Sequence, residues 1–191
     1  MKKYVYGIVV LLLCLPLGAA PIQWTTASGG NGHWYEAVWQ GLDWNPAVAY
    51  AASQTYDGKA GYLASITSQA ESDFVVSQFG STQQYFIGLT DRPQEGTWIW
   101  QSGEPFVFSK WASGEPNNYG GGDPVNGEDY AVINWQHAEQ PAPQPPGSWN
   151  DLGHFSGPFL VEYGDPVPEP STWLLAAGGI GALLTARRRT R

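Results

Sequence analysis

Oxygen-bearing side chains gather in one short stretch of the chain, from Gly114 to Asp129, which contains no Lys or Arg. The stretch holds four acids, three Asn, five Gly and two Pro, a composition that favours a loop over a helix or strand. Carboxylate and amide oxygens without Cys or clustered His are the ligands of a hard cation such as calcium, which takes about six to eight oxygens. The sequence therefore predicts a Ca²⁺ site in this loop.

Similar groups recur on either side of this loop. Asp91 and Glu95 lie upstream in a turn-forming segment, and Asn150 and Asp151 follow Trp149 downstream. Each group falls in a turn or at the end of an expected strand. Carboxylates that meet in the fold would raise one another's pKa and destabilise it unless a cation were bound between them.

Two helices followed by short strands are expected to position these groups. Asn45 is predicted to cap the first helix, and Ser68 and Glu71 fit a capping box for the second. The second helix is predicted to bury an apolar face made of Ala70, Phe74 and Val75. The expected helices span residues 45–54 and 68–79, and the expected strands span residues 85–89, 97–101, 130–134 and 159–163. This order predicts an α+β fold with small antiparallel sheets.

The charge of the chain limits the classes of partner. Between residues 21 and 170, only Lys59, Arg92 and Lys110 stand against all 17 acids of the chain. This balance argues against a nucleic-acid partner and favours a cation.

The two ends of the chain are expected to lie outside the folded domain. Residues 1–20 are typical of an export signal peptide, because two Lys precede an apolar run that ends in small residues. The alternative, a membrane anchor, requires a longer apolar run. The only cysteine, Cys14, lies in this signal, so the domain expected at residues 22–163 is disulfide-free.

A Pro-rich linker, residues 164–170, leads to an apolar run and a terminal Arg cluster. The run from Trp173 to Ala186 would form a membrane helix of about 21 Å, shorter than a hydrocarbon core of about 30 Å. A simple tail anchor is one reading. Residues 168–191 also resemble a PEP-CTERM sorting signal, which contains Pro168, Glu169 and Pro170. That resemblance implies processing by an exosortase-type enzyme, transient membrane contact, and export in a Gram-negative bacterium that makes exopolysaccharide, to the cell surface, outer membrane or extracellular matrix.

The domain itself resembles the C-type lectin-like domain. The resemblance is carried by the segments WIWQ, Glu-Pro-Asn, Gly-Glu-Asp and Trp-Asn-Asp in that order, and by GYLASITSQAESDFV in the helical half. It implies a C-type lectin-like fold with a long loop region. The sequence departs from the family in lacking its cysteines, with Tyr130 standing where one is expected. The loops before Glu128 and Trp149 are also longer than usual, and Asp123 and Asn126 could add ligands.

The resemblance implies two metal sites. The principal Ca²⁺ site would use Glu115, Asn117, Glu128, Asn150 and Asp151, with a cis peptide bond at Pro116. An auxiliary site would use Asp91, Glu95, Asn118 and Asp129 together with Glu128. Asn118 stands where the fuller version of that site has an acid, so the auxiliary site is expected to be weaker.

A calcium ion with open positions can exchange water for two neighbouring sugar hydroxyls. Glu115 and Glu128 can accept the hydroxyl hydrogens, while the amides of Asn117 and Asn150 can donate to the remaining lone pairs. The resemblance further implies that the Glu-Pro-Asn order selects mannose- or glucose-type diols.

Three functions can be compared on this evidence. The first is calcium-dependent carbohydrate binding, and the second is binding of a protein or another surface by loops that calcium braces. The third, a glycosidase with a carboxylate pair, lacks a nucleophile–base arrangement, and His33, His137 and His154 are isolated. The sequence therefore predicts a binding protein and not an enzyme.

Overall fold

The computed structural model describes residues 20–120, 127–135 and 143–165. Most of the predicted signal peptide, the predicted membrane helix at 173–186 and the sorting-signal residues lie outside these ranges. Within the described ranges, no helix has the length and apolar character needed to cross a membrane.

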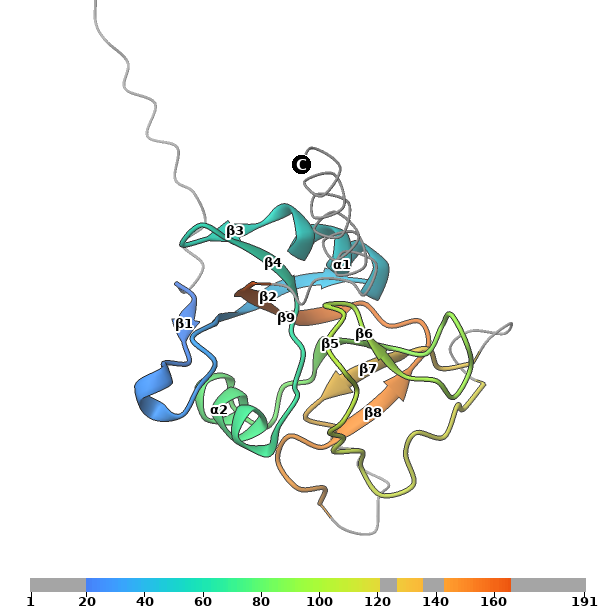
Figure 1. The fold of residues 1–191 in the computed structure, drawn as a ribbon. Helices are drawn as coiled ribbons and strands as arrows, with labels where there is room; N and C mark the ends of the chain where they lie inside the picture. The colour runs from blue at the N-terminus through green and yellow to red at the C-terminus, as the bar shows by residue number, and fades with distance from the viewer. Residues whose placement is uncertain (1–19, 121–126, 136–142, 166–191) are drawn as a thin grey trace, which may run out of the picture.

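One sheet of nine strands organises the described residues, and α1 and α2 pack against it (Figure 1). The elements in chain order are β1 (Ile22–Gln23), a 3₁₀ turn (Thr26–Ser28), β2 (Trp34–Leu42), α1 (Trp44–Ser53), β3 (Thr55–Tyr56), β4 (Lys59–Leu63), α2 (Gln69–Phe79), β5 (Tyr85–Thr90), β6 (Ile99–Trp100), β7 (Tyr130–Ile133), β8 (Trp149–Leu152) and β9 (Gly157–Gly164). The main path of the sheet runs β1-β2-β9-β5-β7-β8, while β4 pairs with β3 and β9, and β6 pairs with β5.

The sheet is mixed, because β5 and β9 contact each other in parallel at Phe86 and Phe159 while the other pairs are antiparallel. The predicted α+β class and C-type lectin-like fold are confirmed. The expected small separate sheets are joined into one, because β9 pairs with β2, β4 and β5. The first long strand, β2, was not predicted, since only part of its length is buried.

Alternate residues of the central strands contribute their side chains to two hydrophobic cores on opposite faces of the sheet. Phe86 and Ile87 on β5 point to different clusters, as do Phe159 and Leu160 on β9. This alternation follows from the two-residue period of a strand. Helix α1 covers one core through residues that include Trp44, and α2 covers the other through Val75.

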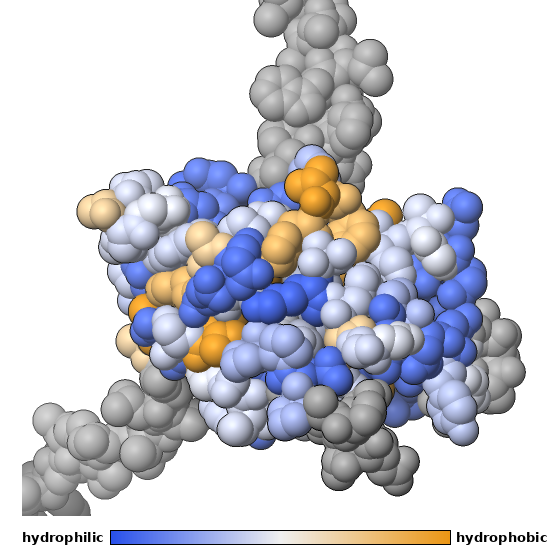
Figure 2. Space-filling view, turned by 90° about the horizontal axis from the view of Figure 1, so that it is seen from below, coloured by the Kyte–Doolittle hydropathy of each residue, from blue (hydrophilic) through white to orange (hydrophobic). Residues whose placement is uncertain are grey.

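The surface carries few large apolar side chains. The exposed ones among the described residues are Trp39, Ile99, Val107 and Tyr119. On the face seen in Figure 2, hydrophobic residues are interspersed with hydrophilic ones and form no single broad apolar surface.

Helix α1 begins two residues earlier than predicted, at Trp44. Asp43 occupies its N-cap position without a side-chain capping bond, so the prediction that Asn45 caps this helix is wrong. Asn45 lies in the first turn, and its Nδ2 donates to the Tyr130 hydroxyl at 3.2 Å. The Asn45 side chain, which the local sequence pattern assigned to a helix cap, therefore bonds to a residue of the distant strand β7.

Helix α2 starts as predicted. Ser68 is its N-cap residue and accepts a hydrogen bond from the Glu71 backbone N–H at 3.1 Å. The Glu71 carboxylate turns to Thr67, accepting from both its N–H and its hydroxyl. Of the predicted apolar face, Val75 is buried and Phe74 packs against the core, but Ala70 is exposed.

Replacement of Ser68 by Ala is expected to lower the free energy of unfolding by about 1 kcal/mol, because the first turn of α2 would lose its capping bond. Urea unfolding followed by circular dichroism measures this change. The matched control is Ser77→Ala in the same helix, where the exposed hydroxyl donates to the Phe74 carbonyl and accepts from the exposed Gln78 side chain, and does not cap the helix. Equal effects of the two substitutions would show that the cap contributes nothing specific.

Candidate functional site

Three segments meet at one edge of the sheet and carry most of the predicted ligands. Strands β7 and β8 pair with Ala131 opposite Asp151 and Val132 opposite Asn150. Glu128 and Asp129 precede the first residue of β7, which pairs with Leu152, so these two acids are close to Asp151. The long segment between β6 and β7 supplies the third group, from Glu115 to Asn118.

Backbone bonds fix this long segment against β8. The Trp149 N–H donates to the Lys110 carbonyl, and the Ala112 N–H donates to the Trp149 carbonyl, both at 2.8 Å. The Glu115 N–H then donates to the Ala112 carbonyl at 3.0 Å. The turn that begins at Glu115 is thereby held next to Asn150 and Asp151.

Four Trp residues in the segments that carry these loops pack against one another. Trp100 and Trp149 are buried, and their ring centroids are 5.8 Å apart in an edge-to-face arrangement. Trp111 contacts Trp149 at 5.7 Å and Trp98 at 4.7 Å. These contacts make the Trp residues part of the core that supports the loops.

Asp151 organises the turn after Glu115. The Glu115–Pro116 peptide bond is cis. Beyond it, the Asn117 N–H donates to Asp151 Oδ1 at 3.1 Å, and the Asn118 N–H donates to Asp151 Oδ2 at 2.8 Å. One buried carboxylate on β8 therefore binds two consecutive amides of the loop.

Glu128 is bound to the same turn from the other side. Its Oε2 accepts from the Tyr119 N–H at 2.9 Å, and its own N–H donates to Asn118 Oδ1 at 2.8 Å. Asn118 adopts a positive φ of 47° in this arrangement. The loop and the start of β7 are thus joined by reciprocal bonds.

Negative charge accumulates where these segments meet. Burial, the Asp151 charge and a contact with the Asp151 side chain raise the pKa of Glu115 to about 7. Burial and the charges of Asp151 and Glu115 likewise raise the pKa of Glu128 to about 7, although the Tyr119 N–H opposes the shift. The three acids are therefore close enough to repel one another.

Two buried oxygens at this place receive no hydrogen bond from the described part of the chain. Among the described residues, neither Glu115 Oε2 nor Asn150 Oδ1 accepts a hydrogen bond. Such an oxygen is costly to bury unless a proton, water or cation satisfies it. A cation would satisfy both oxygens and offset the repulsion among the acids, so the donor set fits a divalent ion with oxygen ligands.

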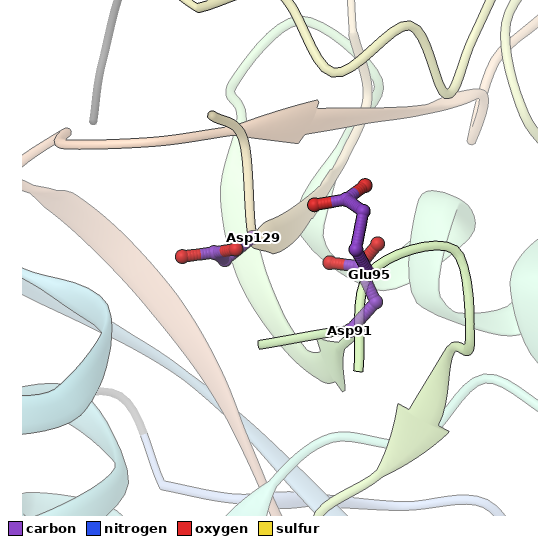
Figure 3. Close-up of side chains that lie close together, drawn as sticks. All are labelled: Asp91, Glu95 and Asp129. Carbon is purple, nitrogen blue, oxygen red and sulfur yellow. The ribbon is translucent and has the colours of Figure 1, made fainter. Parts of the chain in front are cut away.

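A second acidic group includes Asp129, the neighbour of Glu128 in the sequence. One carboxylate oxygen from each of Asp91, Glu95 and Asp129 lies within 4.8 Å of the other two (Figure 3). Asp91 and Glu95 come from the loop after β5, and Asp129 comes from the residue before β7. Asp91 Oδ1 is buried and accepts no bond among the described residues, while Oδ2 accepts from the Gly96 N–H at 2.9 Å.

Burial raises the pKa of Asp91 to about 6, with smaller contributions from the charges of Glu95 and Asp129. Arg92 supplies a positive charge at the edge of this group, with Nη1 at 3.2 Å from Asp129 Oδ2. The Asn118 side chain, a predicted ligand of this second site, accepts a hydrogen bond from the Glu128 N–H instead. Arg92 therefore partly balances the charge that a second cation would otherwise neutralise.

Sequence reasoning missed Arg92 as a component of the site, although its place directly after Asp91 in a domain with few basic residues was a usable signal. It also missed Tyr119, an exposed aromatic residue whose N–H bonds to Glu128. Asp123, Asn126 and the sorting-signal residues Pro168, Glu169 and Pro170 lie outside the described residues.

Comparison with family models gives two matches. A model described as the lectin C-type domain matches residues 45–140, and a model of the PEP-CTERM protein-sorting motif matches residues 166–189. The second match confirms the resemblance of the tail to a sorting signal.

Individual proteins are similar to the same domain. Halomucin of Haloquadratum walsbyi is 33% identical over 142 residues, covering 70% of this chain and 1% of halomucin. Lectin BRA-3 of Megabalanus rosa is 35% identical over 121 residues, covering 63% of this chain and 64% of that protein. The chain thus spans less than two thirds of either relative.

A solved structure shares the fold. The carbohydrate-recognition domain of cow CD23, determined in the presence of a GlcNAc2Man3 oligosaccharide, has a TM-score of 0.53 and 26% sequence identity. The similarity covers 68% of this chain and 86% of that one.

Proposed function

The chain belongs to the C-type lectin domain family, and on that basis we propose that it binds carbohydrate through a calcium ion held by Glu115, Asn117, Glu128, Asn150 and Asp151. The family consists of carbohydrate-binding proteins that are not enzymes, so no catalytic residue is assigned. The proposal rests chiefly on buried oxygens of Glu115 and Asn150, which accept no hydrogen bond within the described part of the chain, beside mutually repelling acids. An ion that bridges them accounts for both features.

The five residues would have different roles in binding the ion and the sugar. Asp151 already holds two amides of the loop, so its role includes fixing Asn117 in place. The ion, when bound, supplies a charged centre with positions open to two sugar hydroxyls. Glu115 and Glu128 would accept the hydroxyl hydrogens, and Asn117 and Asn150 would donate to the hydroxyl oxygens.

We propose that the preferred ligand is a mannose- or glucose-type diol. The Glu-Pro-Asn order from Glu115 to Asn117 supports this preference by family resemblance. The mannose-containing oligosaccharide in the cow CD23 structure is in line with it, at 26% identity. One shallow site would bind a monosaccharide weakly, and clustering of the protein on a surface would raise the overall strength.

A glycan array probed with the purified protein, in calcium and again in EDTA, tests the proposal. We expect signals on mannose- or glucose-terminated glycans that disappear with EDTA. If chelation lowers thermal stability while no glycan is bound in calcium, the ion only braces the loops and the ligand is a protein or another surface.

The Asp91, Glu95 and Asp129 group is proposed as a weaker auxiliary calcium site, with Asn118 as a further ligand by family resemblance. Arg92 supports the lower affinity, because its guanidinium already neutralises part of the charge on Asp129. Calcium titration should then show a second, weaker binding event.

The sorting motif indicates a protein that is exported in a Gram-negative bacterium. We propose that residues 1–20 are removed as a signal peptide, that residues 22–163 form the lectin domain, and that the tail contacts the membrane until an exosortase-type enzyme processes it. The protein would then be exposed at the cell surface or associated with exopolysaccharide. Retention of full-length chain in the inner membrane after Pro168, Glu169 and Pro170 are replaced by Ala would support this route.

The double substitution Glu115→Gln with Asn117→Asp should move preference towards galactose-type diols, because it exchanges the acceptor and donor that flank Pro116. We expect the ratio of mannose to galactose binding to fall by about tenfold or more. Competition by methyl mannoside and methyl galactoside against an immobilised glycan measures that ratio. An unchanged ratio in a variant that still binds calcium would show that the triplet does not contact sugar.

A further inference from the structure

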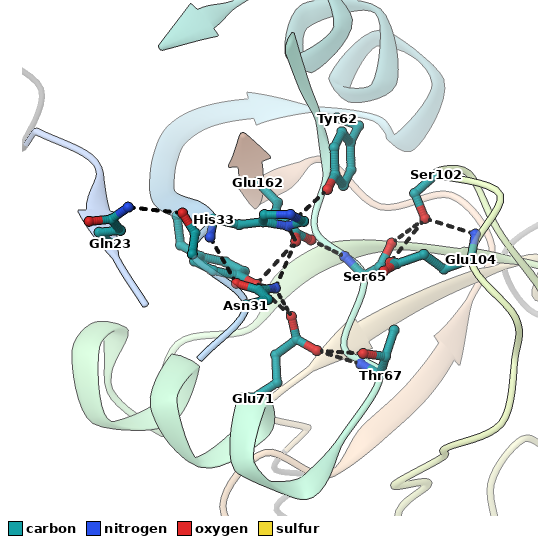
Figure 4. A network of polar contacts seen from close by, with 12 residues as sticks. Gln23, Asn31, His33, Tyr62, Ser65, Thr67, Glu71, Ser102, Glu104 and Glu162 are labelled. Atoms are coloured by element: carbon teal, nitrogen blue, oxygen red, sulfur yellow. Dashed lines mark hydrogen bonds and ion pairs between the residues drawn. The ribbon is translucent and has the colours of Figure 1, made fainter. Parts of the chain in front are cut away.

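A buried pair of carboxylates that the proposed function does not use lies between α2 and β9 (Figure 4). Glu71 is 1% exposed and Glu162 is fully buried. The Tyr35 hydroxyl lies between them, 2.5 Å from Glu71 Oε1 and 3.1 Å from Glu162 Oε1. Two acids from distant parts of the chain thus share one phenol.

The outer oxygens of the pair are well supplied with donors. Glu71 Oε2 accepts from the Thr67 N–H at 2.7 Å and from the Thr67 hydroxyl at 2.9 Å. Glu162 Oε2 accepts from the Ser65 N–H at 3.0 Å. The loop that enters α2 is therefore bonded to both acids.

The two inner oxygens, Oε1 of each acid, compete for the Tyr35 hydroxyl hydrogen. The Tyr35 hydroxyl has a single hydrogen, so it can donate to only one of the two Oε1 atoms at a time. Asn31 Nδ2 lies 2.8 Å from the Tyr35 oxygen but 3.5 Å from each carboxylate oxygen. One additional proton on Glu71 would complete a chain from Glu71 through Tyr35 to Glu162.

His33 supplies the neighbouring positive charge. Its Nδ1 lies 2.6 Å from Glu162 Oε1, and its backbone N–H donates to Asn31 Oδ1 at 2.9 Å. With His33 charged and one carboxyl protonated, the cluster is neutral overall. With both protons removed, two negative charges would remain buried, which is strongly unfavourable.

We propose that Glu71 and Glu162 form a proton-dependent clasp that holds residues 31–35 against α2 and β9 and loosens as rising pH removes its protons. The clasp joins three segments of a domain in which no disulfide can form, because Cys14 is the only cysteine of the chain. A further bond from the Ser65 hydroxyl to the Ser102 hydroxyl, 2.7 Å long, connects it to the base of the loop after β6.

The titratable groups that face the pair come from each packed segment: His33, Tyr35, Tyr62 on β4, and Glu104 after β6. Burial and the Glu162 charge raise the pKa of Glu71 to about 7. The hydrogen bond to Glu162 raises the pKa of His33. Burial raises the pKa values of Tyr35 and Tyr62, so both phenols stay neutral, and burial also raises that of Glu104.

The direction of the pH effect follows from these shifts. Glu71 binds its proton more tightly when folded than when unfolded, and so does His33. Their contribution to stability is complete below the ordinary pKa values of the unfolded chain, 4.5 for Glu71, and is lost as pH rises through the folded values. The clasp therefore weakens from about pH 5 to above pH 7.

Comparison of the wild-type protein with Glu71→Gln tests the clasp, because Gln imitates the protonated acid at every pH. We expect the unfolding equilibrium constants of the two proteins to be similar near pH 5. Towards pH 7, the ratio of the wild-type constant to the variant constant should rise by up to about tenfold per pH unit. Urea unfolding at each pH, in calcium, measures the ratio. Groups at the calcium site contribute equally to both proteins, so failure of calcium binding would not alter the comparison.

A ratio that stays constant from pH 5 to pH 8 would overturn the proposal. If Glu71→Gln does not fold, hydrogen exchange of the wild-type protein decides instead. After correction for intrinsic rates, protection of the Ser65 and Thr67 amides should fall above pH 7 more than that of amides in the β7–β8 pair. Equal changes in both places would refute the clasp.

Discussion

Asp151→Asn is expected to abolish calcium binding at the principal site and, with it, retention on a mannose resin. The substitution removes one negative charge from the proposed ligand set, and one oxygen becomes an amide that cannot accept the bonds made by Asn117 and Asn118. Loss of charge and displacement of Asn117 act together, so we expect calcium affinity to fall by about 100-fold or more. Isothermal titration with calcium measures this change.

Asp73→Asn is the matched control. Asp73 is exposed on α2 and bonds only to Gln69 among the described residues. The Asp73→Asn substitution changes the net charge by the same amount as Asp151→Asn but lies outside the site. The calcium affinity of this variant should therefore equal that of the wild-type protein. Retention of Asp151→Asn on the resin in calcium would contradict the assigned role of Asp151.

Calcium should stabilise the domain far more at pH 8 than at pH 5. The pKa values of Glu115 and Glu128 are both raised to about 7 without the ion, so acid keeps these carboxyls protonated and the ion must displace their protons. When burial and repulsion raise the pKa of a carboxyl, its ionisation at higher pH destabilises the fold unless a cation is bound. The ion reverses that effect, because it binds the ionised form.

Two displaced protons make the affinity for calcium at least about 100-fold weaker at pH 5 than at pH 8. The difference in melting temperature between calcium and EDTA should therefore grow steadily over this range. Glu128→Gln removes one of the titrating groups and should reduce the dependence on pH as well as the affinity. A difference that is the same at both pH values would show that neither acid binds the ion.

Local sequence signals predicted those features that depend on neighbouring residues. Ser68 caps α2 because the capping pattern needs only the next three residues. The strands β5, β7 and β9 were found because they are short, β-branched or aromatic, and buried on both faces. The motif order also indicated the fold family, which the family models confirm.

Features that depend on long-range pairing were not accessible from the sequence. Asn45 was assigned to a cap because nothing local shows that Tyr130, 85 residues away, would receive its amide. The register that sets Ala131 opposite Asp151 depends on the pairing of β7 with β8. Residue types predicted a hard-cation site and the family resemblance named its ligands, but neither showed which oxygens would be buried without a donor.

Buried charge was the hardest feature to foresee. Acidic residues are normally exposed, so Glu71 and Glu162 were read as parts of a helix cap and a strand. Their burial becomes visible only when β2, α2 and β9 are assembled around Tyr35. For the same reason His33 looked isolated in the sequence, although it contacts Glu162.

A crystal structure of the protein grown in calcium with a mannose disaccharide tests the central claim most directly. The account predicts one ion bound by Glu115, Asn117, Glu128, Asn150 and Asp151, with two adjacent sugar hydroxyls completing its coordination. An ion-free site in which these five side chains point apart, with the disaccharide bound elsewhere or absent, would contradict it.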